Sequence, residues 1–309
     1  MKTLYLYTPN EAERYLRLLR EALPEWDVAC WPQNADADAV THVAAWKPPE
    51  DFFQRFPKLE TIFAMGAGVD KFLQRTDIAP HVRIVRLTDA GMAQQMAEYC
   101  LYGVLHYQRQ MDHYRQQQRT GQWQPLGTRL ARDVRVGILG LGELGGRVAS
   151  QLVRLGYRVS GWSRQARAIE GVRCLHGEAG LHALLPEADV LFCVLPATPH
   201  TRHLLDAGRL ALLPDGAALI NAGRGSLIDE DALLARLDAG QLRFALLDVF
   251  AEEPLPETHP FWRHPRVIIT PHVAADTLPE DTVAQIAANL RAQAADEPPA
   301  GLVDRRRGY

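Results

Sequence analysis

The chain has 309 residues, of which 47% are hydrophobic and 23% charged, an ordinary composition for a globular protein of about two domains. The net charge of −3 provides no general attraction for nucleic acid or an anionic membrane, so we expect neither as a partner. The four cysteines form no C-x-x-C pair and no Cys/His grouping with zinc spacing, so we expect no metal site. Charge appears early at the N-terminus and no apolar run approaches the ~18 residues of a membrane span, so we expect a cytoplasmic protein.

The first part of the chain alternates short apolar runs with a helical pattern. Apolar residues recur at helical spacing over 10–23, and Asn10 is the expected N-cap of that helix. Candidate strands lie at 3–7, 27–31, 40–46, 59–65 and 83–87. Alternation of strands and helices predicts a parallel sheet with helices on both faces.

A long helix over 92–118 and a loop over 119–133 are expected to precede a second alternating series. Its candidate strands lie at 134–140, 157–162, 188–196, 217–223, 244–250 and 266–272, and its helices at 143–156 and 229–240. Asp229 suits the N-terminus of the latter helix and Gly240 its C-cap. A last helix is expected over 277–296. The near-continuous apolar strands predict a second doubly wound α/β domain.

A glycine-rich turn joins the first strand of this series to its helix. Gly140, Gly142 and Gly145 form G-x-G-x-x-G with a strand before and a helix after. The first glycine permits a tight turn, the second lets the backbone approach a pyrophosphate, and the third lets helix and strand pack closely. The pattern favours dinucleotide binding. The alternatives are a close-packed turn without ligand, or a site for another adenosine ligand such as S-adenosylmethionine.

The segment GWSRQAR at 161–167 follows the next strand, where NAD-binding domains place an Asp or Glu on the ribose 2′-hydroxyl. This chain has Ser163 and Arg164 there, with Arg167 nearby. A guanidinium can bind a 2′-phosphate in a bidentate way, and a carboxylate would repel it. The segment therefore favours NADP(H), with NADH as the weaker alternative. Which arginine contacts the phosphate is open, with Arg164 preferred, and all of these residues could instead be solvated loop residues.

Three later strands are followed by polar residues, and the carboxyl ends of such strands face the ligand crevice. Arg224, the pair Glu252–Glu253 and His272 lie after successive strands, and Asp248 ends one of them. This set suits reduction of a 2-oxo acid. A protonated imidazole can donate to the carbonyl oxygen, a carboxylate stabilises that imidazolium, and a guanidinium can bind the substrate carboxylate. Taken singly, each could also be a loop contact, a solvated acid or a core histidine.

Four segments occur in this order on the expected elements: GLGELG at 140–145, NAGRGSLIDEDAL at 221–233, LLDVFAEEPLP at 246–256 and ITPHVAA at 269–275. With them the chain resembles the D-isomer-specific 2-hydroxyacid dehydrogenase family over essentially its whole length. Local features at 161–164, 44–49, 63–72 and 303–309 are most similar to the members that reduce glyoxylate and hydroxypyruvate.

The resemblance implies that Arg224, Glu253 and His272 are the catalytic residues. Glu253 is chosen over Glu252 because the glutamate of the family motif directly precedes a proline. The implied cofactor-binding residues, including those of the turn and the 161–167 loop, are Gly140, Gly142, Glu143, Leu144, Gly145, Ser163, Arg164, Pro196, Asn221, Ala222, Gly223 and Asp248. Among them, the resemblance places Asp248 beside the nicotinamide carboxamide.

The resemblance also implies a substrate site. The amides of Ala67 and Gly68 would hold the substrate carboxylate together with Arg224, which fits the ability of small residues to expose N–H groups to an anion. Trp46 would line the substrate pocket, although it could also be an apolar residue that ends a strand.

The family fold revises the domain division. It implies a flavodoxin-like substrate domain of residues 1–98 and 276–309 and an inserted Rossmann dinucleotide-binding domain of residues 99–275. It also implies hinges near Met92 and Ala275, closure of a cleft on ligand, and a homodimer formed through the cofactor domains.

The sequence therefore predicts NADPH-dependent reduction of small 2-oxo acids, from glyoxylate to glycolate and from hydroxypyruvate to D-glycerate. One alternative is a non-catalytic binding protein on the same fold that senses dinucleotides for a partner. The other is a 2-hydroxyacid dehydrogenase with a different substrate, including an oxidative NAD enzyme, against which the missing acid near Ser163 argues.

Overall fold

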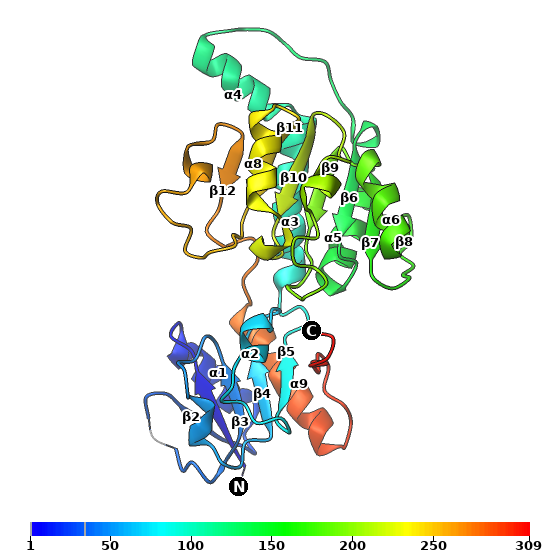
Figure 1. Cartoon of the computed structure of the whole chain (residues 1–309). Coiled ribbons are helices and arrows are strands. Elements are labelled where there is room, and N and C mark those ends of the chain that lie inside the picture. Colours follow the sequence, from blue (N-terminus) through cyan, green and yellow to red (C-terminus); the bar gives the residue numbers. More distant parts are fainter. Residues whose placement is uncertain (1, 34) are drawn as a thin grey trace. The chain divides into compact units, whose positions relative to one another are not determined.

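The computed structural model describes residues 2–33 and 35–309 and divides the chain into two compact units (Figure 1). Unit 1 consists of the residues up to Met92 together with Asp276–Tyr309, and unit 2 consists of Ala93–Ala275. The sequence-based division placed the first boundary at 98/99, which lies within the helix α3.

In the described part of unit 1, five parallel strands form one sheet in the order β2-β1-β3-β4-β5. The strands are β1 (Thr3–Tyr7), β2 (Asp27–Cys30), β3 (Val40–Ala45), β4 (Thr61–Ala64) and β5 (Arg83–Arg86). The helices are α1 (Ala12–Ala22), α2 (Asp70–Leu73), α9 (Pro279–Ala294) and the short η1 (Phe53–Arg55). Separate apolar clusters cover the two faces of the sheet, and α1 and α9 contribute to the same one, so the last helix completes the core of the first strands.

Unit 2 contains a larger parallel sheet, whose described strands follow the order β12-β11-β10-β9-β6-β7-β8. The strands are β6 (Arg135–Leu139), β7 (Arg158–Ser163), β8 (Arg173–His176), β9 (Val190–Cys193), β10 (Ala217–Asn221), β11 (Leu242–Leu247) and β12 (Val267–Ile269). The helices are α3 (Met92–Gln108), α4 (Met111–Thr120), α5 (Glu143–Arg154), α6 (Gly177–Leu184), α7 (Ala207–Leu210) and α8 (Glu230–Asp238), with short helices η2 (Ala131–Asp133), η3 (Leu185–Glu187), η4 (Gly225–Leu227) and η5 (Pro260–Arg263).

Apolar side chains bury both faces of this sheet. Helices α3 and α5 share one cluster with it, and α6, α7 and α8 share the other. Every predicted strand overlaps an observed one, with ends that differ by up to three residues. The doubly wound α/β fold expected from the apolar runs is confirmed for unit 2, and a parallel α/β sheet is confirmed for unit 1.

Two local predictions were wrong, and some elements were not predicted. The helix expected over 92–118 is interrupted, because Gln110 adopts a left-handed φ of 57° between α3 and α4. Asn10 does not cap α1: the N-cap is Glu11, with φ 51°, and the Asn10 carbonyl instead accepts a hydrogen bond from Thr8. The strand β8 and the helices α2, α6 and α7 were not predicted.

The ends of helix α8 follow the prediction. The Asp229 carboxylate accepts the N–H of Ala232 at 3.1 Å, and Gly240 just beyond the helix has a φ of 69°. Across residues 2–33 and 35–309, no helix combines the length and apolar character needed to cross a membrane.

Candidate functional site

Three neighbouring strands of unit 2 end level with one another. Asn221 of β10 pairs with Leu247 of β11, which pairs with Ile269 of β12. Two backbone hydrogen bonds continue this alignment into the loops, from Asp248 N–H to the Asn221 carbonyl at 3.0 Å and from His272 N–H to the Asp248 carbonyl at 2.9 Å. The loops that carry the predicted catalytic residues therefore leave from the same edge of the sheet, its carboxyl edge.

Arg224 lies in a tightly fixed loop after β10. The Asn221 side chain holds this loop from both sides, since its amide donates to the Arg224 carbonyl at 3.0 Å and its oxygen accepts the Gly223 N–H at 3.2 Å. A Cβ at Gly225 would lie 1.8 Å from the carbonyl carbon of Phe250, so glycine lets this loop touch the next one. The half-buried Arg224 side chain donates to the Gly223 carbonyl at 2.8 Å.

Glu253 belongs to the loop after β11. One carboxylate oxygen accepts the Phe250 N–H at 3.1 Å, and Glu230 accepts the neighbouring Ala251 N–H at 2.9 Å. Burial acts to raise the pKa of Glu253, but hydrogen bonds from His272 and Phe250 and the charges of His272 and Arg224 outweigh it and lower the pKa. Glu253 is therefore an ionised acceptor at neutral pH.

His272 lies next to this carboxylate. Its Nδ1 is 2.8 Å from the second carboxylate oxygen of Glu253. Because an ionised carboxylate only accepts hydrogen bonds, Nδ1 donates, which leaves Nε2 for a ligand. The His272 side chain is 49% exposed and its backbone has a left-handed φ of 57°. A histidine fixed at one nitrogen and accessible at the other is the arrangement that a proton donor needs.

Asp248 is the first residue after β11 and is 1% exposed. One carboxylate oxygen accepts from the Thr270 hydroxyl at 2.6 Å and the Val273 N–H at 2.9 Å, and the other accepts the Ala274 N–H at 2.9 Å. These bonds hold the backbone that follows His272. These contacts join the end of β11 to the loop that follows β12. The position of Asp248 beside the nicotinamide, which the family resemblance implies, stays a prediction.

The glycine-rich turn has the predicted geometry at two positions. Gly140 has a φ of 112°, which favours glycine. A Cβ at Gly145 would lie 1.8 Å from the Gly140 carbonyl oxygen, so this glycine permits close contact of helix and strand. Gly142 precedes α5, and beyond its chain neighbours a Cβ there would meet no heavy atom of the described residues within 4 Å. The turn is thus open at the position where a pyrophosphate would approach.

The strand order also places this turn at a point where doubly wound sheets bind ligands. From β6 the chain moves outward through β7 and β8 and returns to β9 on the other side of β6, which is a topological switch point. Pro196 follows β9, while the buried Ala222 donates its N–H to the Cys193 carbonyl. The predicted residues Glu143, Leu144, Pro196 and Asn221–Gly223 therefore follow strands at the edge where doubly wound sheets bind ligands.

The 161–167 segment contains the last residues of β7, which ends at Ser163, and the loop that follows it. The Ser163 hydroxyl donates to the Gln165 carbonyl at 2.7 Å, and both Arg164 and Arg167 are exposed. Ser163 pairs in register with His176 at the end of β8. The site therefore presents cationic and hydroxyl groups where NAD-specific domains present an acid.

The predicted substrate residues of unit 1 follow its strands β3 and β4. Trp46 is half-buried and packs on Gly66, where a Cβ would lie 2.6 Å from the indole ring. Among the described residues, the N–H groups of Ala67 and Gly68 have no hydrogen-bond acceptor. These two amides are therefore free to bind an anion.

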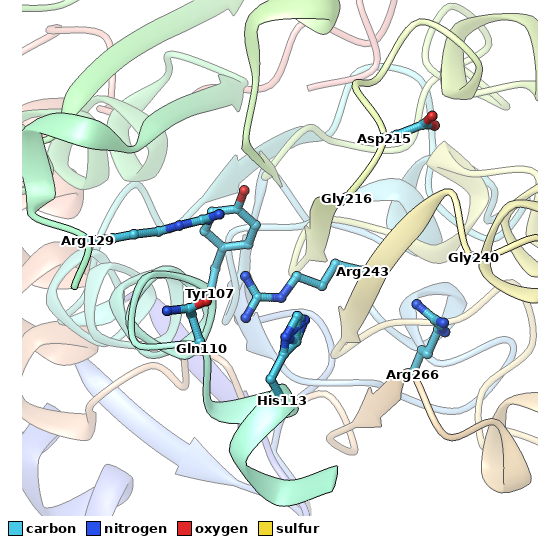
Figure 2. Close-up of a pocket in the computed structure, with 9 residues that line it drawn as sticks. All are labelled: Tyr107, Gln110, His113, Arg129, Asp215, Gly216, Gly240, Arg243 and Arg266. Carbon is cyan, nitrogen blue, oxygen red and sulfur yellow. The ribbon is translucent and has the colours of Figure 1, made fainter. Parts of the chain in front are cut away.

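A pocket of about 300 Å³ lies at the opposite, amino edge of the unit 2 sheet (Figure 2). Its lining residues are Tyr107, Gln110, His113, Arg129, Asp215, Gly216, Gly240, Arg243 and Arg266. Asp215–Gly216, Gly240 and Arg266 come just before strands, whereas the predicted catalytic residues come just after them. The pocket is thus separate from the candidate site.

A glycine-rich turn at the switch point of a doubly wound sheet defines the class of dinucleotide-binding domains. The family model "D-isomer specific 2-hydroxyacid dehydrogenase, NAD binding domain" matches residues 101–274. The chain belongs to the D-isomer specific 2-hydroxyacid dehydrogenase family.

Three relatives illustrate how similar the chain is to known members. A glyoxylate/hydroxypyruvate reductase A from Serratia proteamaculans is 42% identical over the full length of both chains. A D-isomer specific 2-hydroxyacid dehydrogenase from Xanthobacter autotrophicus Py2, in complex with NADPH and MES, has a TM-score of 0.95 at 40% identity and covers 100% of this chain and 99% of its own. An NADPH-dependent glyoxylate/hydroxypyruvate reductase from Sinorhizobium meliloti, in complex with NADP and sulfate, has a TM-score of 0.93 at 34% identity over 100% of both chains.

Several residues that organise the site were not singled out from the sequence. Thr270 and Tyr99 form hydrogen bonds between different elements, and local residue spacing does not predict such bonds. Glu230 was expected only at the N-terminus of a helix, and its hydrogen bond to Ala251 was not foreseen. His176 was missed together with its short strand β8, because residues 172–176 show no regular alternation of apolar and polar residues.

Proposed function

We propose that this protein is an NADPH-dependent reductase of small 2-oxo acids, with glyoxylate and hydroxypyruvate as leading substrates. The observation that carries the proposal is the pair of His272 and Glu253, 2.8 Å apart at the carboxyl edge of a dinucleotide-binding sheet. The names of the similar proteins from Serratia and Sinorhizobium support the choice of substrate.

When bound, the cofactor supplies a hydride to the carbonyl carbon of the substrate. The residues of the chain handle the proton and the charges. His272 donates a proton from Nε2 to the carbonyl oxygen, and Glu253 stabilises the imidazolium through Nδ1. Arg224 binds the substrate carboxylate and polarises the carbonyl. One hydride and one proton convert the 2-oxo acid into the 2-hydroxy acid, with the D configuration for prochiral substrates.

The residues at the glycine-rich turn fit NADP(H). The open position at Gly142 and the N-terminus of α5 suit the pyrophosphate, and Ser163 and Arg164 suit the 2′-phosphate. In this proposal, Glu143, Leu144, Pro196, Asn221, Ala222, Gly223 and Asp248 complete the cofactor site. NADH serves as the weaker alternative because the 2′-phosphate contacts would be lost.

Unit 1 is proposed as the substrate domain and unit 2 as the cofactor domain. The amides of Ala67 and Gly68 would bind the substrate carboxylate, which their lack of acceptors among the described residues supports. Trp46 would line the substrate pocket and limit it to small acids.

We also propose a cytoplasmic homodimer. The side chains of α4 are all exposed or half-buried, and Met111, Trp123 and Leu130 are large apolar side chains exposed on or after that helix, with Trp123 97% exposed. A second copy would cover them. Cys30, Cys100, Cys174 and Cys193 are free thiols, as expected in a reducing compartment.

The test is an assay of purified protein with NADPH and either glyoxylate or hydroxypyruvate. We expect oxidation of NADPH, a lower kcat/KM with NADH, and loss of turnover in the His272→Gln variant. Folded protein that leaves NADPH unchanged with both acids would refute the proposal. Light scattering of the same sample measures the mass and tests the dimer.

A further inference from the structure

The structure assigns Tyr99 and Thr270 as positioning residues for His272, acting through a chain of hydrogen bonds that ends on Asp248. This inference rests on the proposed reductase function, because it concerns the proton donor of that reaction. All of the residues involved belong to unit 2, and the contacts that carry the assignment join helix α3, the end of β12 and the end of β11.

The direction of each hydrogen bond in this series follows from the number of protons that each group can donate. The Thr270 hydroxyl donates its single proton to the Asp248 carboxylate across 2.6 Å. The Thr270 oxygen then accepts from the Tyr99 hydroxyl across 2.7 Å. Burial raises the pKa of Tyr99, and the charge of Asp248 raises it further, so the phenol remains protonated and can donate.

Asp248, the last residue in this series of hydrogen bonds, fixes the backbone at His272 and at the two residues that follow it. The Asp248 carbonyl accepts the His272 N–H, and the Asp248 carboxylate accepts the N–H groups of Val273 and Ala274. His272 has a φ of 57°, a conformation that L side chains adopt only when their surroundings hold it. Thr270 therefore orients the carboxylate that holds His272 in this conformation, and Tyr99 orients Thr270.

Two different sets of residues therefore hold the His272 ring and the His272 backbone. Glu253 holds the ring at Nδ1, whereas Asp248, Thr270 and Tyr99 hold the backbone from which the ring projects. A small displacement of that backbone would move Nε2 away from a substrate oxygen while leaving the cofactor turn unchanged. Since misplacement by about 1 Å can slow catalysis by about 100-fold, hydroxyls remote from the substrate can affect turnover strongly.

The test compares Thr270→Val, Thr270→Ser and Tyr99→Phe with the unaltered protein. We expect Thr270→Val to lower kcat for glyoxylate by about 30-fold and Tyr99→Phe by about 5-fold. Thr270→Ser, which keeps the hydroxyl, should restore kcat to within about 3-fold of the original value. The matched control is Tyr102→Phe, which removes the hydroxyl of an exposed tyrosine on the same helix.

A second measurement reads His272 without turnover. Spectra of the ring N–H groups in protein with isotope-labelled histidine, with the His272 signal assigned by His272→Gln, should change in Thr270→Val and return in Thr270→Ser. An unchanged His272 signal and unchanged kcat in folded Thr270→Val would overturn the assignment. If the unaltered protein reduces neither acid, the proposed function fails, and the ring spectra still decide whether Thr270 positions His272.

Discussion

The two edges of the unit 2 sheet use charged residues in opposite ways. At the amino edge, Arg243 is 8% exposed, donates from Nε to Asp112 at 2.7 Å and lies 4.8 Å from the Tyr107 ring. At the carboxyl edge, the His272 side chain is 49% exposed and is held at Nδ1 by Glu253. The amino edge uses its ion pair to attach α4 to the sheet, whereas the carboxyl edge keeps a reactive group fixed and accessible.

The largest effect is expected from replacing His272 at the carboxyl edge. We expect His272→Gln to lower kcat by about 10³-fold, or about 4 kcal/mol of transition-state stabilisation, because the proton donor is lost. The free energy of unfolding should change little, since the side chain is half exposed. A kcat within about 10-fold of the original would show that this histidine does not transfer the proton.

The amino edge should give the reverse result. Asp112→Asn leaves the Arg243 guanidinium without its carboxylate in a largely buried position, so we expect a loss of about 3 kcal/mol in the free energy of unfolding. Turnover per folded molecule should stay the same. Urea unfolding measures the first quantity, and Asp215→Asn, an exposed acid that lines the same pocket, is the control. Equal free energies of unfolding for the two variants would show that the ion pair does not stabilise the fold.

The end of β7 and the first residue after it provide a test on the cofactor side of the same edge. Ser163→Asp combined with Arg164→Ala should shift the ratio of kcat/KM for NADPH over NADH by about 100-fold toward NADH, or about 2.7 kcal/mol, because charged hydrogen bonds to the 2′-phosphate are lost. Arg173→Ala, which removes an exposed arginine from β8, is the control. An unchanged ratio would place the recognition of the 2′-phosphate elsewhere.

His42 in unit 1 is a buried titratable residue outside the candidate site. It allows a test of how such a residue affects stability alone. It is 2% exposed on β3, with its ring nitrogens bonded to Thr41 at 2.8 Å and Gln293 at 3.0 Å. Burial lowers the pKa of His42 from 6.5 to about 4, against a smaller opposing effect of Gln293.

The sign of the pH effect follows from these values. Between the two pKa values the unfolded chain binds a proton that the folded chain does not, so stability falls as the pH falls through this window. The contribution from His42 should be about 2 kcal/mol between about pH 7 and about pH 5. Urea unfolding at both pH values measures it, and His42→Gln should reduce the difference by that amount. An identical pH dependence in the variant would contradict the assignment.

The sequence predicted best those features that are encoded by burial or by backbone freedom. Apolar runs located the strands because parallel strands are covered on both faces. The glycine-rich turn was predictable because Gly140 and Gly145 have steric reasons to lack a side chain. The interruption at Gln110 was not, since the residues after it still favour a helix and glutamine gives no sign of a left-handed conformation.

The candidate site was predicted only in part. Residue types after strands indicated Arg224, Glu253 and His272, because strand ends of a parallel sheet share one edge. The hydrogen bonds of Thr270 and Tyr99 could not be foreseen, because they join residues far apart in the sequence whose distance depends on the packing of α3 against the sheet.

The discontinuity of unit 1 sets an order of events during synthesis. Unit 2 is complete once Ala275 has left the ribosome, whereas the core of unit 1 still lacks Val283, Ile286 and Leu290 of α9. Because domains fold as units, the middle of the chain can finish folding before its beginning. A chain that stops at Ala275 should therefore contain a protease-resistant unit 2 and a protease-sensitive N-terminal segment, and resistance of both would contradict this order. The core of unit 1 is therefore complete only after its N-terminal strands and the C-terminal helix α9 have both been synthesised.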